Sequence, residues 1–114
     1  MIFAVATDER TLFVFSSAAA ANAYCEGIDV EDGGWLFWDE AGTALAPEFL
    51  TSNYRDKFTV GSGTYQLVPA PHRPLLAEVI TEINHLEANP YFADLSAVRT
   101  HFAIATRTSQ HGAQ

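Results

Sequence analysis

The sequence predicts one α+β domain, in which a mostly antiparallel sheet of about five strands carries one alanine-rich helix and two C-terminal helices packed on it. Short apolar and aromatic runs separated by turn residues are typical of antiparallel strands. A run of alanines and a later stretch with apolar residues at helical spacing indicate helices. With 114 residues, of which 48% are hydrophobic, the chain has enough material for one core.

The N-terminal part predicts a β-hairpin followed by a helix. Residues 2–7 and residues 12–15 are apolar runs, and the polar residues between them suit a short loop. Because neighbouring positions in both runs are apolar, we expect strands that are covered on both faces or that keep one face for a partner. We expect Ser16 or Ser17 to cap the alanine-rich helix, and Gly27 to end it in a left-handed conformation.

The middle of the chain predicts an acidic loop over residues 28–34 and then a strand over residues 35–38. Side chains alternate along a strand, so Trp35 lies on the same face as Phe37 and on the opposite face from Trp38. Three further segments complete this part: a weaker strand over residues 43–50 interrupted at Pro47, a surface loop over residues 51–59, and a strand over residues 64–68.

The C-terminal part predicts two helices. Residues 73–88 carry apolar residues at helical spacing, and Asn89 and Pro90 end that helix. The expected buried stripe consists of Leu75, Leu76, Val79, Ile80, Ile83 and Leu86. Asp94 is expected to cap a short final helix. The expected inner face of this final helix consists of Leu95, Val98 and Phe102. The domain is placed at residues 1–106, and residues 107–114 are expected to form a polar tail.

Charge and composition narrow the classes of partner. The chain has 14 acidic and 6 basic residues, for a net charge of −8, which repels phosphate backbones and anionic lipids. We therefore expect no nucleic acid and no membrane as partner, although an acidic composition also serves solubility alone. The N-terminus has no signal-peptide pattern, and the single Cys25 excludes an internal disulfide. These observations predict a cytoplasmic protein.

The sequence has no motif that specifies a catalytic or metal chemistry. The four histidines share no spacing typical of metal ligands, and the turn at residues 61–63 precedes a strand, whereas a phosphate loop precedes a helix. Cys25 has Glu26 beside it and no positive neighbour, so we expect a buried, inert thiol. We expect no catalytic residue, no metal and no cofactor.

The stretch YCEGIDVEDGGWLFWDEAG, residues 24–42, combines both tryptophans with six acidic residues and no lysine or arginine. Exposed aromatic side chains anchor a protein partner, and carboxylates pair with its arginines and lysines. The candidate partner-binding residues are Asp29, Glu31, Asp32, Trp38, Asp39 and Glu40. A second interpretation stays open, in which both tryptophans belong to the core and the acidic residues form a solvated turn.

The alanine-rich helix, this acidic aromatic stretch and the later SGTYQLVP, residues 62–69, before two closing helices resemble immunity proteins of bacterial polymorphic-toxin and contact-dependent growth-inhibition systems. The resemblance implies a non-enzymatic inhibitor that binds one cognate toxin domain, often a nuclease, and blocks its active site. It implies no catalytic residue. The candidate contact residues come from the charge pattern and not from the family.

The first functional prediction is therefore an immunity protein, not an enzyme, that neutralises a cognate and basic toxin domain as a monomer or weak homodimer. Two alternatives stay open. One is an adaptor or structural subunit of a larger protein assembly, which would use the same aromatic surface. The other is a small enzyme that acts through carboxylates, which would need a pocket containing an acid with a raised pKa.

Overall fold

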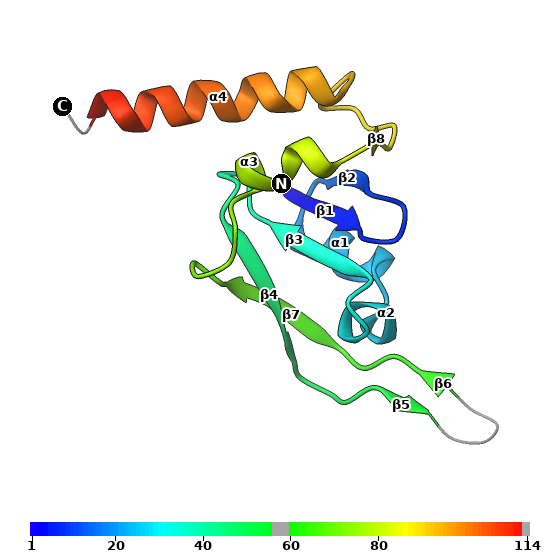
Figure 1. The fold of residues 1–114 in the computed structure, drawn as a ribbon. Helices are drawn as coiled ribbons and strands as arrows, with labels where there is room; N and C mark the ends of the chain where they lie inside the picture. Colours follow the sequence, from blue (N-terminus) through cyan, green and yellow to red (C-terminus); the bar gives the residue numbers. More distant parts are fainter. Residues whose placement is uncertain (56–59, 113–114) are drawn as a thin grey trace.

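The main element of the fold is a six-stranded sheet with the strand order β7-β4-β3-β1-β2-β8 (Figure 1). The computed structural model describes residues 1–55 and 60–112, with side chains for residues 1–53 and 61–103. The strands are β1 (Ile2–Ala6), β2 (Thr11–Phe15), β3 (Trp35–Trp38), β4 (Ala44–Phe49), β7 (Tyr65–Pro69) and β8 (His85–Leu86). Every neighbouring pair is antiparallel except β2 and β8. The predicted α+β class is confirmed, with six strands in this sheet where about five were expected.

Helices cover both faces of this sheet (Figure 1). The helical elements are α1 (Ala18–Tyr24), α2 (Gly27–Glu31), α3 (Leu76–Val79), the 3-10 helix η1 (Ile80–Glu82) and α4 (Leu95–Gly112). The two remaining strands, β5 (Tyr54–Arg55) and β6 (Val60–Gly61), pair with each other on an arm that extends β4 and β7 (Figure 1). Within the described residues, no helix combines the length and the apolar character that crossing a bilayer requires.

The central strand β1 is buried on both of its faces. It pairs with β2 along one edge and with β3 along the other, and its first four residues are at most 8% exposed. Phe3 and Val5 face the side covered by α3, η1 and α4, whereas Ile2 and Ala4 face the side covered by α1 and α2. The consecutive apolar residues of this run thus mark a strand that is covered on both faces.

Two clusters of buried side chains form the core, one on each face of the sheet. The first consists of Phe3, Val5, Leu12, Trp38, Ala44, Leu76, Ile80, Ile83, Val98 and Phe102. The second consists of Ile2, Ala4, Ala21, Cys25, Val30, Phe37, Leu45 and Tyr65, with Trp35 packed against it. Trp35 and Trp38 therefore lie on opposite faces, as the alternation along β3 predicts.

Two predicted helix caps are confirmed, and one predicted helix end is wrong. Ser17 Oγ accepts a hydrogen bond from Ala20 N at 3.1 Å, and Asp94 Oδ1 accepts one from Ala97 N at 2.9 Å. α1 ends at Cys25 with φ −91°, and Gly27 does not take the expected left-handed conformation. Gly27 instead begins α2, so the expected acidic loop over residues 28–34 is helical in its first half.

The helix expected over residues 73–88 is wrong in length. Helical structure covers only residues 76–82, and Ile83 is extended with ψ 130°. Backbone pairing with β2 and the turn before it ends the helix, because Asn84 N donates to Arg10 O and Glu87 N donates to Leu12 O, both at 2.9 Å. Of the expected stripe, Leu76, Ile80 and Ile83 are buried, Val79 and Leu86 are half-buried, and Leu75 is exposed.

The final helix α4 is longer than the short helix that the sequence predicts. Val98 and Phe102 are buried and Leu95 is half-buried, which confirms the predicted inner face. The helix continues to Gly112, so the expected polar tail is helical as far as residue 112. The placement of the domain boundary at residue 106 stays a prediction.

Two further expectations, for the strand over residues 43–50 and for the loop over residues 51–59, are wrong in part. β4 runs unbroken through Pro47, which pairs with Leu67 of β7, so the expected interruption is wrong. β3 pairs only with Ala44 and Leu45, and the open edge beyond Leu45 is where a strand tolerates a proline. In the expected loop over residues 51–59, Tyr54–Arg55 form β5, and residues 56–59 lie outside the described residues.

Gly42 fixes the turn between β3 and β4 against two helices, which gives a testable prediction. Its φ is +85°, its carbonyl accepts a hydrogen bond from Leu76 N at 2.9 Å, and an added Cβ would lie 2.8 Å from Phe102 Cε1 of α4. We expect Gly42→Ala to lower the free energy of unfolding by about 2–4 kcal/mol in urea titrations, through backbone strain and overpacking together.

Gly33→Ala is the matched control, because Gly33 has φ +83° and nothing within 4 Å of an added Cβ. It should cost the backbone strain alone, about 1–2 kcal/mol. Equal losses for the two variants would contradict the close packing of α4 on the turn at Gly42.

Candidate functional site

The six candidate partner-binding residues do not form one site. Asp29 and Glu31 lie on α2 and Asp32 follows it, so these three precede β3. Asp39 and Glu40 lie in the turn after β3. The four residues of β3 separate the two groups by about 13 Å of extended chain. The acidic stretch is therefore divided between the two ends of one strand.

Trp38 belongs to the core and does not form one contact surface with the acidic residues. It is 3% exposed, and its indole Nε1 donates a hydrogen bond to Pro74 O at 2.9 Å. In this conformation it is buried between β3 and the segment that precedes α3, so a partner has no access to its ring from the acidic residues. Trp35, at the other end of β3, is half-buried and lies next to Asp29 and Asp32.

Asp39 has a structural task within its turn. It is half-buried, and its Oδ1 accepts hydrogen bonds from Ala41 N at 3.0 Å and from Thr43 N at 2.9 Å. This is the Asx-type arrangement in which an aspartate replaces a backbone carbonyl of a turn. The neighbouring Glu40 is exposed.

Glu31 is connected to the arm that carries β5 and β6. Asn53 Nδ2 donates hydrogen bonds to Glu31 Oε2 and to Gly27 O, each at 3.0 Å. Asn53 Oδ1 accepts one from Gly63 N at 2.6 Å. Asn53 therefore joins α2 to both sides of the arm.

The remaining acidic residues before β3 border an open cleft of about 420 Å³. We call it the acidic cleft. Its lining residues are Ala6, Thr7, Asp8, Glu9, Asp29, Asp32, Gly33, Gly34 and Trp35. It thus contains four carboxylate side chains and one tryptophan, and among the residues whose side chains are described no lysine, arginine or histidine lines it. Acidic side chains from separate parts of the chain thus meet at this hollow.

Backbone hydrogen bonds hold the two sides of the acidic cleft together. Thr7 N donates to Gly34 O at 3.0 Å, and Thr7 Oγ1 donates to Gly33 O at 2.8 Å. Gly34 N in turn donates to Asp29 O at 2.8 Å. The turn after β1 is therefore tied to α2 and to the start of β3. Carboxylates carried by such a framework keep their spacing before a partner arrives, which lowers the entropic cost of binding.

Sequence reasoning did not identify Asp8 and Glu9, which it placed in a hairpin loop. They lie about 20 positions before Asp29 along the chain. The antiparallel pairing of β1 with β3, in which Ala6 lies opposite Trp35, brings the two segments together. Predicting that pairing would have been enough to place all four carboxylates at one end of the sheet.

The thiol of Cys25 is enclosed in the second core cluster. Cys25 is fully buried, and its carbonyl accepts a hydrogen bond from Tyr65 Oη at 2.5 Å. Burial, with a smaller contribution from Asp29, raises the pKa of this thiol from 9.0 to about 12. The residue is therefore a poor nucleophile, as expected for a buried thiol. Within residues 1–55 and 60–112, no group of three or more His, Cys, Asp or Glu side chains is placed to hold a metal ion.

Comparison of the chain with models of protein families, with curated proteins and with solved structures finds no match. The absence of a metal and of a cofactor stays a prediction.

The role of Asp39 can be tested by stability. We expect Asp39→Ala to lower the free energy of unfolding by about 1–2 kcal/mol, because two backbone N–H groups lose their acceptor. Glu40→Ala, one position further along the turn, should stay within about 0.5 kcal/mol of the wild type. Both values come from urea titrations. If Asp39→Ala leaves the free energy of unfolding unchanged, the structural role of Asp39 is contradicted, and Asp39 becomes a candidate contact residue again.

The inert state of Cys25 predicts slow modification by a disulfide reagent. At pH 8, a pKa of about 12 leaves a thiolate fraction about 1000-fold lower than an ordinary thiol has. We expect the folded protein to react with Ellman's reagent at least about 1000-fold more slowly than the protein in urea. Similar rates in the two conditions would contradict the burial of the thiol.

Proposed function

We propose that this protein is a non-enzymatic immunity protein that binds and neutralises a cognate bacterial toxin domain. The partner surface is basic, as in a nuclease that binds nucleic acid, and it binds at the acidic cleft. The protein acts in the cytoplasm as a monomer or weak homodimer, without a cofactor or metal. The proposal keeps the acidic aromatic surface that the sequence suggests but places it at the start of β3, with Trp35 as its aromatic residue.

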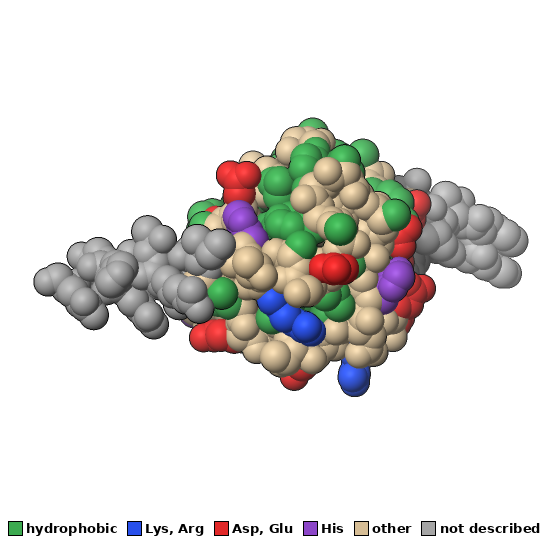
Figure 2. Space-filling view, turned by 90° about the horizontal axis from the view of Figure 1, so that it is seen from above, with side chains coloured by type: hydrophobic (Ala, Val, Ile, Leu, Met, Phe, Trp, Pro, Cys, Tyr) green, Lys and Arg blue, Asp and Glu red, His purple; other side chains and the backbone are tan. Residues whose placement is uncertain are grey.

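The observation that supports this proposal is the grouping of Asp8, Glu9, Asp29 and Asp32 around one hollow, in whose lining no described residue is basic. Like charges repel, so a cationic partner that approaches Asp8, Glu9 and Asp29 lowers the free energy of their grouping. Figure 2 shows the molecule from above Figure 1, and on that face acidic, basic, hydrophobic and neutral side chains are all present.

The cleft suits an arginine or lysine of the partner. A guanidinium group forms paired hydrogen bonds with a carboxylate, and it also stacks on an aromatic ring such as that of Trp35. A net charge of −8 attracts a basic domain over a distance set by the ionic strength. An inhibitor that occupies the cationic active site of a nuclease needs no chemistry of its own.

The adaptor alternative has one observation of its own. Phe13, Phe15, Tyr24 and Trp35 pack ring against ring near the part of β2 that lies beyond its pairing with β8, and Tyr24 is 57% exposed. A partner subunit would use this aromatic cluster. It would not use the backbone of β3 as a full edge, because β3 lies between β1 and β4. The alternative of a small enzyme that acts through carboxylates has less support. It needs an acid enclosed in a pocket, whereas Asp29, Glu31, Asp32 and Glu40 are exposed.

The test begins with affinity capture from a lysate of the source cells, washed at low and at high salt. We expect one secreted protein to be recovered through a basic C-terminal domain, with less retained at high salt. Recovery of metabolic or assembly proteins instead would favour the adaptor.

The captured domain then allows association rates to be compared. Asp8→Lys and Asp29→Lys should each slow association about tenfold at low salt, and the difference should shrink at high salt. Glu87→Lys, an exposed acid outside the cleft, makes the same change in net charge and should have a smaller effect. Equal effects of all three variants would contradict a contact at the acidic cleft.

A further inference from the structure

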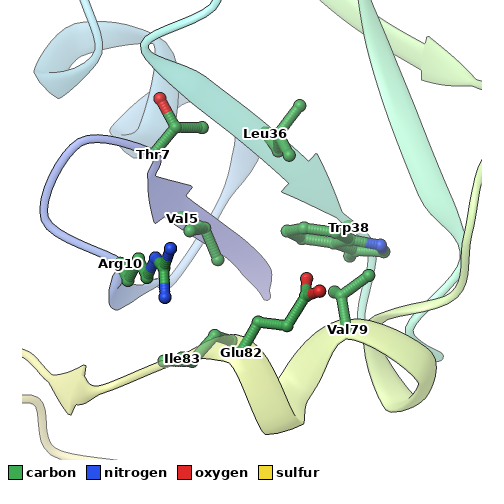
Figure 3. A pocket seen from close by; sticks show the side chains of 8 residues that line it. All are labelled: Val5, Thr7, Arg10, Leu36, Trp38, Val79, Glu82 and Ile83. Carbon is green, nitrogen blue, oxygen red and sulfur yellow. The ribbon is translucent and has the colours of Figure 1, made fainter.

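A second hollow lies at the same end of the sheet as the acidic cleft, but on the opposite face. We call it the Trp38 cavity. It measures about 290 Å³, and its lining residues are Val5, Thr7, Arg10, Leu36, Trp38, Val79, Glu82 and Ile83 (Figure 3). The alternation along paired strands separates the two hollows. Val5 and its neighbour Leu36 face the Trp38 cavity, whereas Ala6 and its neighbour Trp35 face the acidic cleft.

The cavity exists because helical structure ends early on this face. After η1 the chain becomes extended at Ile83 and continues to β8 at the edge of the sheet. No described element covers the corner at the start of β3, where Leu36 is 42% exposed. A helix that continued to residue 88, as the periodicity predicts, would not lead the chain away to β8 at Ile83.

The walls of the cavity are fixed by hydrogen bonds within the protein. The Trp38 ring is held by its bond to Pro74 O, and Asn84 N donates to Arg10 O at 2.9 Å. The second bond ties the turn that carries Arg10 to the residues after η1. Arg10 itself has φ +53°, a left-handed conformation that a residue with a Cβ adopts at a cost of about 1–2 kcal/mol. The backbone around it therefore holds Arg10 in an unfavourable conformation at the cavity.

One positively charged and one negatively charged side chain, Arg10 and Glu82, line the Trp38 cavity, and its other lining residues are uncharged. Arg10 approaches from the turn after β1, and Glu82 approaches from η1 with its carboxylate directed towards the cavity (Figure 3). Neither side chain forms a hydrogen bond or ion pair with another described residue. One cationic and one anionic group are thus available on two sides of an apolar hollow.

We propose that the Trp38 cavity binds a free apolar α-amino acid. The carboxylate of the ligand pairs with the Arg10 guanidinium, and its ammonium group pairs with the Glu82 carboxylate. The side chain of the ligand lies against Val5, Leu36 and Trp38, where an aromatic ring gains from contact with the indole. The volume is just below the roughly 300–1,000 Å³ of pockets that take drug-sized ligands, which fits a ligand of this small size.

The test uses L-phenylalanine and two derivatives as probes, with ¹H–¹⁵N spectra of the whole chain as the readout. L-phenylalanine should shift the Trp38 indole N–H resonance in a saturable way and leave that of Trp35, on the other face, nearly unchanged. N-acetyl-L-phenylalanine lacks the ammonium group, and L-phenylalanine amide lacks the carboxylate. Each derivative should bind about five- to tenfold more weakly.

Two variants assign the charged contacts. Glu82→Gln should weaken L-phenylalanine and leave the N-acetyl derivative unchanged, so that these two probes bind alike. Arg10→Gln should weaken the binding of L-phenylalanine and leave that of L-phenylalanine amide unchanged, so that these two probes bind alike. Glu9→Gln is the matched control, because Glu9 lies next to Arg10 in the same turn but lines the acidic cleft, and it should leave all three affinities unchanged.

Three results would overturn the proposal. One is the absence of saturable shifts at Trp38 up to about 10 mM of L-phenylalanine. Another is equal binding of all three probes to the wild type, which would point to a hollow for the apolar side chain of a protein partner. The last is an equal loss of affinity in Glu9→Gln and Glu82→Gln. The proposal does not rest on the toxin-binding role, so its failure leaves that role untouched.

Discussion

The burial of β1 on both faces is the constraint on which the rest of the structure depends. Four consecutive side chains, Ile2 to Val5, must each be removed from water, and a single layer of helices cannot do this. The chain therefore supplies α1 and α2 on one side and α3, η1 and α4 on the other. Since each fully buried apolar side chain contributes about 1.5–3 kcal/mol, this strand concentrates a large share of the stability in a few residues.

The same constraint determines where binding can occur. Covering both faces places Trp38 in the core, so Trp35 is the tryptophan of β3 that stays half-buried. The two hollows lie where the covering helices end, at the last residues of β1 and the first of β3. One of them is acidic and the other is apolar with a mixed-charge rim. Their positions follow from the alternation of Val5 and Ala6 across the sheet.

Local signals in the sequence predict local structure well. Ser17 and Asp94 cap the helices that follow them, and the two tryptophans of β3 face opposite sides, because these features depend on neighbours a few positions away. The helix over residues 73–88 fails for the opposite reason. Its periodicity is helical, but hydrogen bonds from Asn84 and Glu87 to the turn before β2 and to β2 itself stabilise an extended chain there. Such long-range pairing leaves no mark on the local pattern.

The candidate site likewise combines residues that local sequence identifies with residues that only long-range pairing brings to it. The sequence identifies Asp29 and Asp32 by their density of charge, but Asp8 and Glu9 join them only through the pairing of β1 with β3. The sequence also groups Asp39 and Trp38 with them because they lie in the same stretch, but each has a hydrogen-bond partner inside the protein. Proximity in sequence was thus a poor guide across a strand, whose ends point to opposite sides of the domain.

Native-state hydrogen exchange measures the central claim most directly. If β1 is buried on both faces and paired along both edges, the amides of Phe3, Ala4 and Val5 exchange only through global unfolding, with opening free energies equal to the stability from urea titrations. The short edge strand β8 should open at lower cost. Exchange of the β1 amides as fast as those of β8 would contradict this account, because the strand would then not be the enclosed centre of the fold.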